Sequence, residues 1–241
     1  MMIFFEKTLL IGSLLSFLLS VLIIFLNKRF NQIFSDDTVG VQKFHTQPTP
    51  RLGGLAIAIS YFIMIIFLEE ETRKIWSLIG VAALPILITG LIEDIWKNVK
   101  PLYRLITAIL SGIIFIVFTQ YSINSLDFFY LNQVLSFYFI SLIFTSFAMA
   151  GVVNAVNIID GFNGLALGSL IIILSTFGII AFQIQDFLIF NLTITFILIL
   201  VGIFIVNFPF GKIFMGDAGA YFCGFFLSCI AIMLPFRNDN I

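Results

Sequence analysis

Long apolar stretches separated by short polar connectors run along the whole chain. Most are near or above the roughly 18 residues that cross the hydrocarbon of a bilayer, and no polar stretch is long enough for a separate soluble domain. Apolar windows predict helices over residues 8–26, 53–68, 75–92, 102–119, 132–153, 165–182, 187–206 and 218–235. No alternating barrel pattern is visible, and a spanning segment must satisfy its own backbone polar groups. The pattern therefore predicts an all-α, polytopic membrane protein of about eight spans, forming one domain over residues 1–241.

Composition agrees with a membrane protein. Of the 241 residues, 61% are hydrophobic and 10% are charged, whereas soluble proteins carry roughly 25% charged residues. The formal net charge is -1 and the basic residues sit in short connectors, so we expect no nucleic-acid partner. Cys223 and Cys229 share one apolar run on different helix faces, which indicates free thiols rather than a disulfide or a metal pair.

Basic residues are unevenly divided between the connectors. Those after the odd-numbered spans carry Lys28, Arg29, Lys43, Arg51, Lys97, Lys100, Arg104 and Lys212. The remaining segments carry Lys7, Arg73, Lys74 and Arg237. Because cytoplasmic connectors are enriched in Lys and Arg, we expect the odd connectors to be cytoplasmic and the N-terminus external.

Four Gly, Pro and polar clusters interrupt the apolar pattern, and all four fall in the odd connectors. They read "KFHTQPTPRLGG", "GLIEDIWKNVKPLYRL", "NAVNIIDGFNGLA" and "FPFGKIFMGDAGAYF". Polar groups at membrane depth need partners, so repeated interruptions on one face predict a single polar site there.

Glu93 and Asp94 end the third predicted span. Two carboxylates at a helix C-terminus lie beside the negative end of the macrodipole, so a positive group is expected nearby. Lys97, Lys100 and Arg104 offer one explanation. The other is Mg²⁺, which prefers carboxylate oxygens and bridges to substrate phosphates. Both explanations stay open at this point.

Asn154, Asn157 and Asp160 recur every third residue and would share one slowly drifting face of a helix. Capping a helix end needs only one such group, so the set favours recognition of a polar ligand, with capping as the alternative. Asp217 precedes an apolar run. It is either the N-cap of the last helix or part of a helix N-terminus that attracts a phosphate or a metal-phosphate complex.

The connector "HTQPTPRLGG" combines stiffening prolines, two glycines and a cation. Arg51 can bind a phosphate through two donors at once. His45 is the only histidine, and it is either a solvated loop residue or part of the site. Lys212 is a further candidate for contact with substrate.

Taken together, these four motifs resemble, in order and spacing, those of the polyprenyl-phosphate N-acetylhexosamine-1-phosphate transferases. This membrane family, glycosyltransferase family 4, includes phospho-N-acetylmuramoyl-pentapeptide translocase and undecaprenyl-phosphate GlcNAc-1-phosphate transferases. The resemblance runs from about Lys43 to the end of the chain. It implies transfer of N-acetylhexosamine 1-phosphate from a UDP-sugar to polyprenyl phosphate with release of UMP. It also implies Mg²⁺, or Mn²⁺ in its place, and a bacterial plasma membrane; a homodimer is left open.

The resemblance also implies roles for particular residues. Glu93 and Asp94 match the family's paired aspartates, and Asp160 joins them as a catalytic candidate. Asp217 matches its metal-binding aspartate, with Asp94 as a second metal candidate. The expected substrate-binding residues are His45, Arg51, Asn154, Asn157 and Lys212.

Two positions depart from the family pattern. Glu93 replaces an aspartate, and Asn163 stands where many members carry a second aspartate. Both resemble the branch that serves surface polysaccharides. The family usually continues through further spans and a cytoplasmic loop with a histidine cluster, so we expect a chain that is C-terminally shortened relative to the family.

Two other functions stay open. A transporter or lipid flippase would use the acids as an ion site, although such sites favour ionisable residues at mid-span. A truncated homologue without catalytic activity is the other. For a transferase, a phosphate monoester with a second pKa near 6 needs little proton abstraction at neutral pH. We therefore favour Glu93 and Asp94 as metal and orientation groups over a general base. The motifs do not distinguish among UDP-N-acetylhexosamines.

Overall fold

The computed structural model describes residues 2–30, 35–36, 49–126 and 130–238. Its elements are α1 (Met2–Arg29), β1 (Ser35–Asp36), β2 (Thr49–Pro50), α2 (Gly53–Met64), the 3-10 helix η1 (Ile65–Phe67), α3 (Glu70–Trp96), α4 (Pro101–Thr119), α5 (Leu131–Leu135), α6 (Tyr138–Ile159), α7 (Leu165–Gln183), α8 (Phe187–Asn207) and α9 (Gly216–Arg237). The two short strands pair antiparallel, with Ser35 opposite Pro50.

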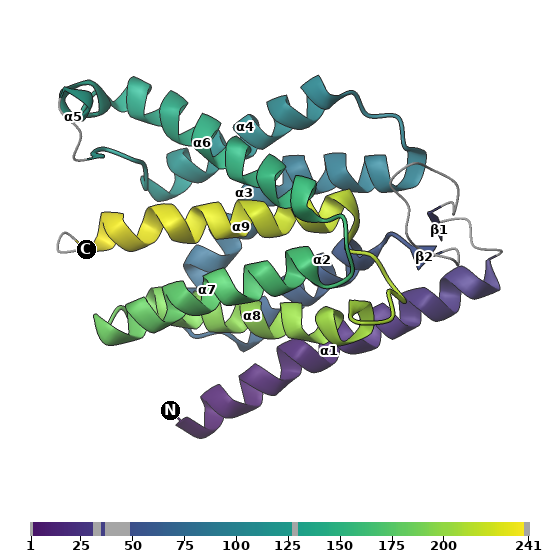
Figure 1. Cartoon of the computed structure of the whole chain (residues 1–241). Coiled ribbons are helices and arrows are strands. Elements are labelled where there is room, and N and C mark those ends of the chain that lie inside the picture. The colour runs from purple at the N-terminus through teal and green to yellow at the C-terminus, as the bar shows by residue number, and fades with distance from the viewer. Residues whose placement is uncertain (1, 31–34, 37–48, 127–129, 239–241) are drawn as a thin grey trace.

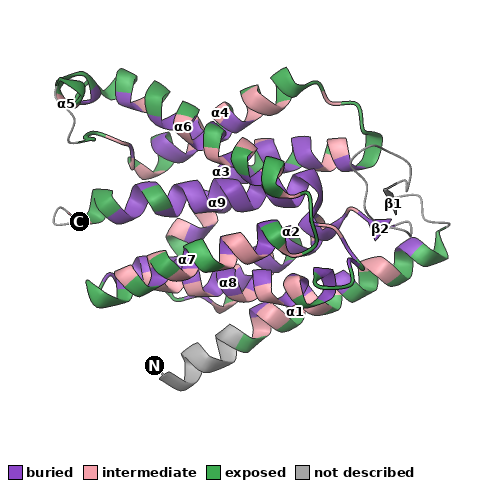
Figure 2. Ribbon diagram, viewed as in Figure 1, coloured by how far each residue is buried: buried purple, intermediate pink, exposed green. Residues whose placement is uncertain are grey.

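The long helices form a bundle around α9 (Figure 1). Helix α9 packs mainly against α3 and α6, while α1 packs on α8 at the edge. Every residue of α9 from Gly216 to Ile230 is buried, whereas the outer sides of α1, α4 and α6 are exposed apolar surface (Figure 2). A central helix surrounded by helices with apolar outer faces is the arrangement expected of a polytopic membrane protein.

The all-α membrane fold predicted from the sequence is confirmed. Within the described residues, seven helices are long and apolar enough to cross a membrane. The second predicted span, 53–68, is the exception, because α2 and η1 together cover only Gly53–Phe67 and fall in a shorter class. The backbone at Leu68 turns to an extended conformation, with ψ 149°, and ends this segment.

Several helix boundaries differ from the predicted ones, and the predicted helix 132–153 is divided into α5 and α6, with α6 beginning at Tyr138. Helix α3 begins at Glu70 rather than at residue 75, and Glu70 and Glu71 occupy its first turn, where acids interact favourably with the helix dipole. Helix α6 continues to Ile159 rather than ending at residue 153. The polar Asn154 and Asn157 end the apolar pattern but remain helical, so apolarity alone placed this end too early.

An aromatic cluster joins α2, α3, α8 and α9 in the core. The rings of Tyr61 and Trp76 stack at 4.1 Å, and Phe196 stacks on Phe226 at 3.9 Å. The Tyr61 hydroxyl donates to the Trp76 carbonyl at 2.7 Å, and Trp76 Nε1 donates to the Tyr61 carbonyl at 2.9 Å. These reciprocal bonds satisfy both polar groups inside the bundle and fix α2 against α3. Cys223 and Cys229 are buried free thiols, as the sequence predicts.

The described parts of the motif-bearing connectors, the first of them over residues 49–54, meet at one end of the bundle. The amino ends of α2 and α9 and the carboxyl ends of α3, α6 and α8 lie there, at the right of Figure 1, whereas the amino end of α1 and the carboxyl end of α9 lie at the opposite end. The predicted gathering of the motifs is therefore present in the fold. Which side of the membrane this end faces stays a prediction from the basic residues.

Candidate functional site

The amino end of α9 forms the base of the candidate site. Gly216 starts the helix with φ +71°, a conformation that side chains strain to adopt. Gly54 of α2 lies directly against Gly219, where a Cβ atom would overlap the α9 backbone. The Gly54 N–H donates to the Met215 carbonyl at 2.7 Å, and the Gly53 N–H donates to the Phe214 carbonyl at 2.9 Å. Backbone contact with α2 thus fixes where α9 begins.

Asp94, in the last turn of α3, holds this same helix end from the other side. Its carboxylate accepts from the backbone N–H of Asp217 at 2.8 Å and of Ala218 at 2.9 Å. The Asp94 side chain is fully buried, at 0% exposure. A carboxylate bound to free N–H groups at a helix N-terminus is a favourable arrangement for both. The capping acceptor of α9 is therefore supplied by another helix.

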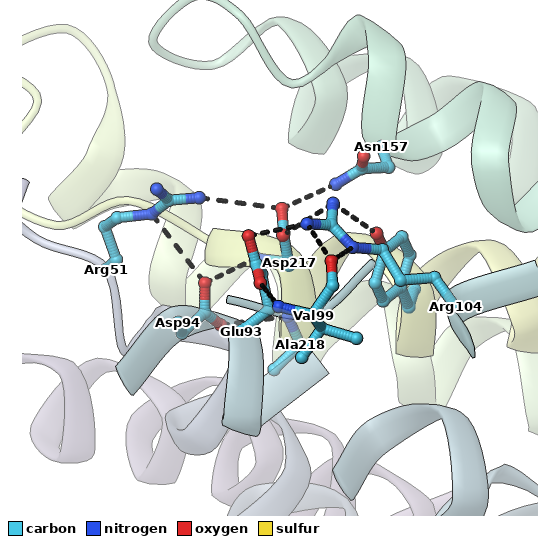
Figure 3. Close-up of polar contacts among 9 residues, drawn as sticks. Arg51, Glu93, Asp94, Val99, Arg104, Asn157, Asp217 and Ala218 are labelled. Atoms are coloured by element: carbon cyan, nitrogen blue, oxygen red, sulfur yellow. Dashed lines mark hydrogen bonds and ion pairs between the residues drawn. The ribbon is translucent and has the colours of Figure 1, made fainter. Parts of the chain in front are cut away.

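The Asp217 carboxylate lies at the centre of a polar network (Figure 3). Asn157 Nδ2 donates to Asp217 Oδ1 at 2.8 Å. The guanidinium groups of Arg51 and Arg104 each lie 3.5 Å from an oxygen of the same carboxylate. Arg51 also lies 3.7 Å from an oxygen of Asp94. The network joins the first connector, α4, α6 and α9 at one carboxylate.

Glu93 and Arg104 form the tightest ion pair in this network. Arg104 Nη2 lies 2.6 Å from Glu93 Oε1, while Glu93 Oε2 accepts from the Val99 N–H at 2.7 Å. Arg104 also donates to the Val99 carbonyl at 3.1 and 3.0 Å and to the Tyr221 hydroxyl at 3.3 Å. The guanidinium is held on several sides, so its orientation beside Asp217 is defined. The predicted pairing of the third span's acids with a nearby cation is thus present, through Arg104.

Asp160 follows the last residue of α6. Its backbone N–H donates to the Asn157 carbonyl at 3.3 Å, and its side chain is half-buried. Burial raises the pKa of Asp160 to about 7; the Arg51 charge opposes this shift and the Asp217 charge adds to it. The carboxyl is therefore divided between its acid and its carboxylate forms near neutral pH.

Asn207, which the sequence analysis did not single out, connects two of the motifs. It is buried at 4% exposure at the end of α8. Its Oδ1 accepts from the Gly164 N–H at 2.6 Å, and its Nδ2 donates to the Ile213 carbonyl at 2.7 Å. Both ends of one amide thus link the "DGFNGL" turn to the segment that leads into α9. A polar residue at the end of an otherwise apolar span was the signal in the sequence.

The remaining expected site residues are placed differently. Asn154 donates to the Ala150 carbonyl of its own helix at 2.7 Å and makes no described contact with the carboxylates. Lys212 is exposed, with Nζ 5.6 Å from the centre of the Phe210 ring. His45 lies outside the described residues. The N-cap alternative for Asp217 is wrong, because the N-cap of α9 is Met215 and Asp217 lies in the first turn.

The donor set at Asp217 was compared with the needs of Mg²⁺. Among the described residues, no three His, Cys, Asp or Glu side chains lie close enough together to hold a metal by themselves. Mg²⁺, however, is usually bound through one or two carboxylates and keeps several waters or takes substrate phosphates. Asp217, with the Asn157 amide beside it, matches that pattern. The residues therefore fit an ion that is completed by water and substrate.

Comparison with known proteins gives a consistent result. The profile of the family described as Glycosyl transferase family 4 matches residues 75–235. A probable undecaprenyl-phosphate N-acetylglucosaminyl 1-phosphate transferase of Bacillus subtilis (strain 168) is 30% identical over 203 residues, covering 83% of this chain and 55% of the relative. A phospho-N-acetylmuramoyl-pentapeptide-transferase of Streptococcus pneumoniae (strain CGSP14) is 31% identical over 197 residues, covering 77% and 60%.

One further relative aligns over more of its length. A phospho-N-acetylmuramoyl-pentapeptide-transferase of Streptococcus agalactiae serotype III (strain NEM316) is 28% identical over 249 residues, covering 92% of this chain and 72% of the relative. The chain thus spans little more than half the length of the first two relatives and most of the third. All of the matched stretch of the family profile lies within α3 to α9.

Proposed function

Since this chain belongs to glycosyl transferase family 4, we propose that it transfers a sugar 1-phosphate from a UDP-sugar to polyprenyl phosphate. The observation that carries the proposal is the network around Asp217, in which Arg51 and Arg104 approach one carboxylate at the end of a membrane bundle. Such a site suits a diphosphate whose acceptor is anchored in the bilayer. The name of the Bacillus subtilis relative supports a polyprenyl phosphate, and the names of the first two relatives both support an N-acetylated sugar.

The proposed reaction is a phosphoryl transfer. A phosphate oxygen of the polyprenyl phosphate attacks the β-phosphorus of the UDP-sugar, and the bond from that phosphorus to the bridging oxygen breaks. UMP leaves with the bridging oxygen, and the lipid carries the sugar as a diphosphate. Such transfers depend mostly on positioning and charge neutralisation. Arg51 and Arg104 stabilise the negative charge on the transferred phosphoryl group and on the leaving phosphate.

Mg²⁺ is the proposed cofactor, with Mn²⁺ as a substitute, and Asp217 is the residue that would hold it. When bound, the ion neutralises phosphate charge and helps to orient the two phosphates. Asn157 contacts Asp217 directly and is proposed to orient its carboxylate. Asp160, with a pKa near 7, is proposed to contact the polar part of the donor in its carboxylate form above that pH.

No general base is required for the nucleophile. A phosphate monoester has a second pKa near 6 and is mostly dianionic at neutral pH, so it attacks without losing a proton to the protein. We therefore propose that the rate in single turnover is flat above about pH 7.5, after Asp160 has ionised. A rate that keeps rising above that pH would instead indicate a base.

The proposal also includes the orientation in the membrane and the pathway. The basic residues at the site end favour a cytoplasmic active site in a bacterial plasma membrane, where UDP-sugars are available. The proposed N-acetylhexosamine donor extends the names of the relatives to this chain. The proposed role in cell-surface polysaccharide synthesis rests on Glu93 and Asn163, which resemble that branch of the family. The acids lie at one end of the bundle rather than at mid-span, which disfavours the transporter alternative.

The test uses membranes that contain the chain, polyprenyl phosphate and radiolabelled UDP-N-acetylglucosamine, with and without Mg²⁺. We expect label to enter the lipid phase only with Mg²⁺. Asp217→Asn should lower the rate by about 10³-fold or more, since it removes the charge that would hold the ion. Asp186→Asn, at the opposite end of the bundle, is the matched control and should transfer label normally. Inserted protein that transfers none of several UDP-N-acetyl sugars would contradict the proposed function.

A further inference from the structure

We propose that Glu93 and Asp94 are positioning residues that fix Asp217 from two sides, rather than groups that bind metal or substrate. Asp94 holds the backbone that carries Asp217, and Glu93 holds the Arg104 guanidinium beside the Asp217 carboxylate. The inference deepens the proposed function, because Asp217 is the residue expected there to bind the metal.

Both carboxylate oxygens of Asp94 accept hydrogen bonds from the amino end of α9. Its Oδ1 accepts from the Asp217 N–H and its Oδ2 from the Ala218 N–H, so each oxygen has a donor at 2.8 or 2.9 Å. The side chain is completely shielded from solvent. Mg²⁺ keeps several waters in its coordination sphere, and a buried carboxylate bound to backbone N–H groups has no room for a hydrated ion. Asp94 therefore acts on the position of α9.

The close contacts around α9 make this position sensitive. Gly216 packs against the Asp94 carboxylate, and an added Cβ atom there would lie 2.7 Å from both carboxylate oxygens. Gly54 and Gly219 meet backbone to backbone on the other side of the helix. Helix α9 cannot move toward either neighbour. Loss of the Asp94 bonds therefore removes the contacts that hold the backbone of Asp217 against α3.

Glu93 acts through a different partner. Its Oε1 lies 2.6 Å from Arg104, and its Oε2 accepts from the Val99 N–H at 2.7 Å. Arg104 is further bound to the Val99 carbonyl, so Glu93, Val99 and Arg104 close a ring of contacts across the α3 to α4 connector. This ring keeps one end of the guanidinium occupied while Nη1 points toward Asp217, at 3.5 Å. Both oxygens of Glu93 are held at 2.6 and 2.7 Å, whereas both arginines stay 3.5 Å from Asp217, so Glu93 is the more tightly bound of the two carboxylates.

The experiment compares Asp94→Ala, Asp94→Asn and Asp217→Asn in the full chain in lipid nanodiscs. Amide hydrogen exchange of peptides over residues 215–220 reports the N–H groups that bind Asp94, and it needs neither substrate nor activity. Mn²⁺ titration followed by electron paramagnetic resonance reports the metal. Asp94→Asn keeps the volume of the side chain, so the test survives if the alanine variant does not insert.

We expect exchange in this segment to accelerate in Asp94→Ala and to recover in part in Asp94→Asn, whose amide oxygen still accepts one N–H. Mn²⁺ affinity should fall by about 10–100-fold in Asp94→Asn, as for residues that orient a ligand, and should be lost in Asp217→Asn. Unchanged exchange in Asp94→Ala, or a loss of Mn²⁺ affinity in Asp94→Asn as large as in Asp217→Asn, would overturn the inference for Asp94.

Glu93 is tested by a double-mutant cycle. If Glu93 acts through Arg104, Glu93→Gln should lower the transfer rate with the KM for the UDP-sugar nearly unchanged, and Glu93→Gln with Arg104→Ala should be no worse than Arg104→Ala alone. Additive losses would overturn its positioning role. A wild-type chain that shows the expected exchange but transfers no sugar would refute the proposed function and leave the Asp94 contact to α9 established.

Discussion

At the end of the bundle away from the candidate site, Asp186 and Arg237 form an ion pair with two contacts, at 2.8 and 3.3 Å. Asn238 donates to the same carboxylate at 3.1 Å, and Asp186 also accepts from the Ile189 N–H as the N-cap of α8. The acid lies at a helix N-terminus and the base in the last turn of α9, where each is favoured by its helix dipole. The negative charge of Asp186 is therefore paired with the positive charge of Arg237.

At the site end the charges are placed less favourably for stability. Glu93 and Asp94 lie at the C-terminus of α3, and Arg104 lies in the first turn of α4, so each opposes its own helix dipole. Both guanidinium groups stay 3.5 Å from Asp217, longer than the contacts of the Asp186 pair. With Asp217 included, three carboxylates face the two guanidinium groups of Arg51 and Arg104.

The two ends of the bundle therefore use buried charged residues in two different ways. A matched pair with ideal placement contributes to folding and leaves no capacity for a ligand. An unmatched group held by its neighbours retains attraction for a cation, and its arginines can exchange a carboxylate for a phosphate. The contrast is the reason for proposing a function at the site end rather than at the end that holds Asp186 and Arg237.

The largest expected difference comes from removing one guanidinium at each end. Arg104→Ala should lower the transfer rate by about 10²–10³-fold, because it removes charge stabilisation beside the transferred phosphate. Arg237→Ala should instead lower the free energy of unfolding by about 2–3 kcal/mol, since it leaves the buried Asp186 carboxylate without its partner. Rate per inserted protein and thermal unfolding in detergent measure the two effects. Equal losses of activity in both variants would contradict the comparison.

An intermediate effect is a pH dependence of opposite sign at the two ends. The pKa of Asp160 is raised to about 7 by burial, so the native state holds its proton more tightly than the unfolded chain. This contribution to stability is present at about pH 4 and is lost as the pH rises to about 7. Burial alone would raise the pKa of Asp186, but the hydrogen bonds from Arg237 and Asn238 hold it below its ordinary value. Its contribution is present above about pH 4 and is lost on further acidification.

Thermal unfolding between about pH 3 and 8 measures both trends. Asp160→Asn should reduce the decline between pH 4 and 7, and Asp186→Asn should reduce the decline at lower pH. If a variant shows the same decline as the unmodified protein, the pKa assignment for the residue replaced in that variant would be wrong.

The smallest expected effect belongs to Lys212, which is exposed and whose nearest described contact is the Phe210 ring. If it contacts the phosphates of the UDP-sugar, Lys212→Gln should raise the KM a few-fold, more strongly at low salt, and leave the unfolding temperature unchanged. Initial rates at two ionic strengths measure this. A KM that is unchanged at both would remove Lys212 from the substrate-binding residues.

The sequence predicted the helices well because long apolar runs have few alternatives in a bilayer. It also predicted that Asp94, Asn157, Arg51 and Asp217 gather at one end, since span counting alone places their connectors on the same side. It did not predict that Asp94 caps another helix. That depends on how α3 and α9 cross, which apolar patterns do not encode.

Two further features of the site were not predicted from the sequence, because they depend on how the helices pack and on contacts with backbone atoms. Asn154 and Asn157 share a sequence spacing, but only Asn157 reaches Asp217, because the rotation of α6 against α9 decides which of them faces inward. Asn207 was missed since one polar residue after an apolar run usually marks only a span end. Its two contacts are to backbone atoms, and those carry no signature in the side-chain sequence.

Helix α9 lies at the centre of the bundle, yet it follows in the chain every helix against which it packs. During synthesis, α2, α3 and α6 must enter the membrane before their shared partner exists. Gly54 and Asp94 are therefore made before the helix that both contact in the finished bundle. Asp94 gains its two backbone N–H donors only once α9 has been made. The network around Asp217 can therefore form only after α9 has been made, because no earlier part of the chain supplies its central carboxylate.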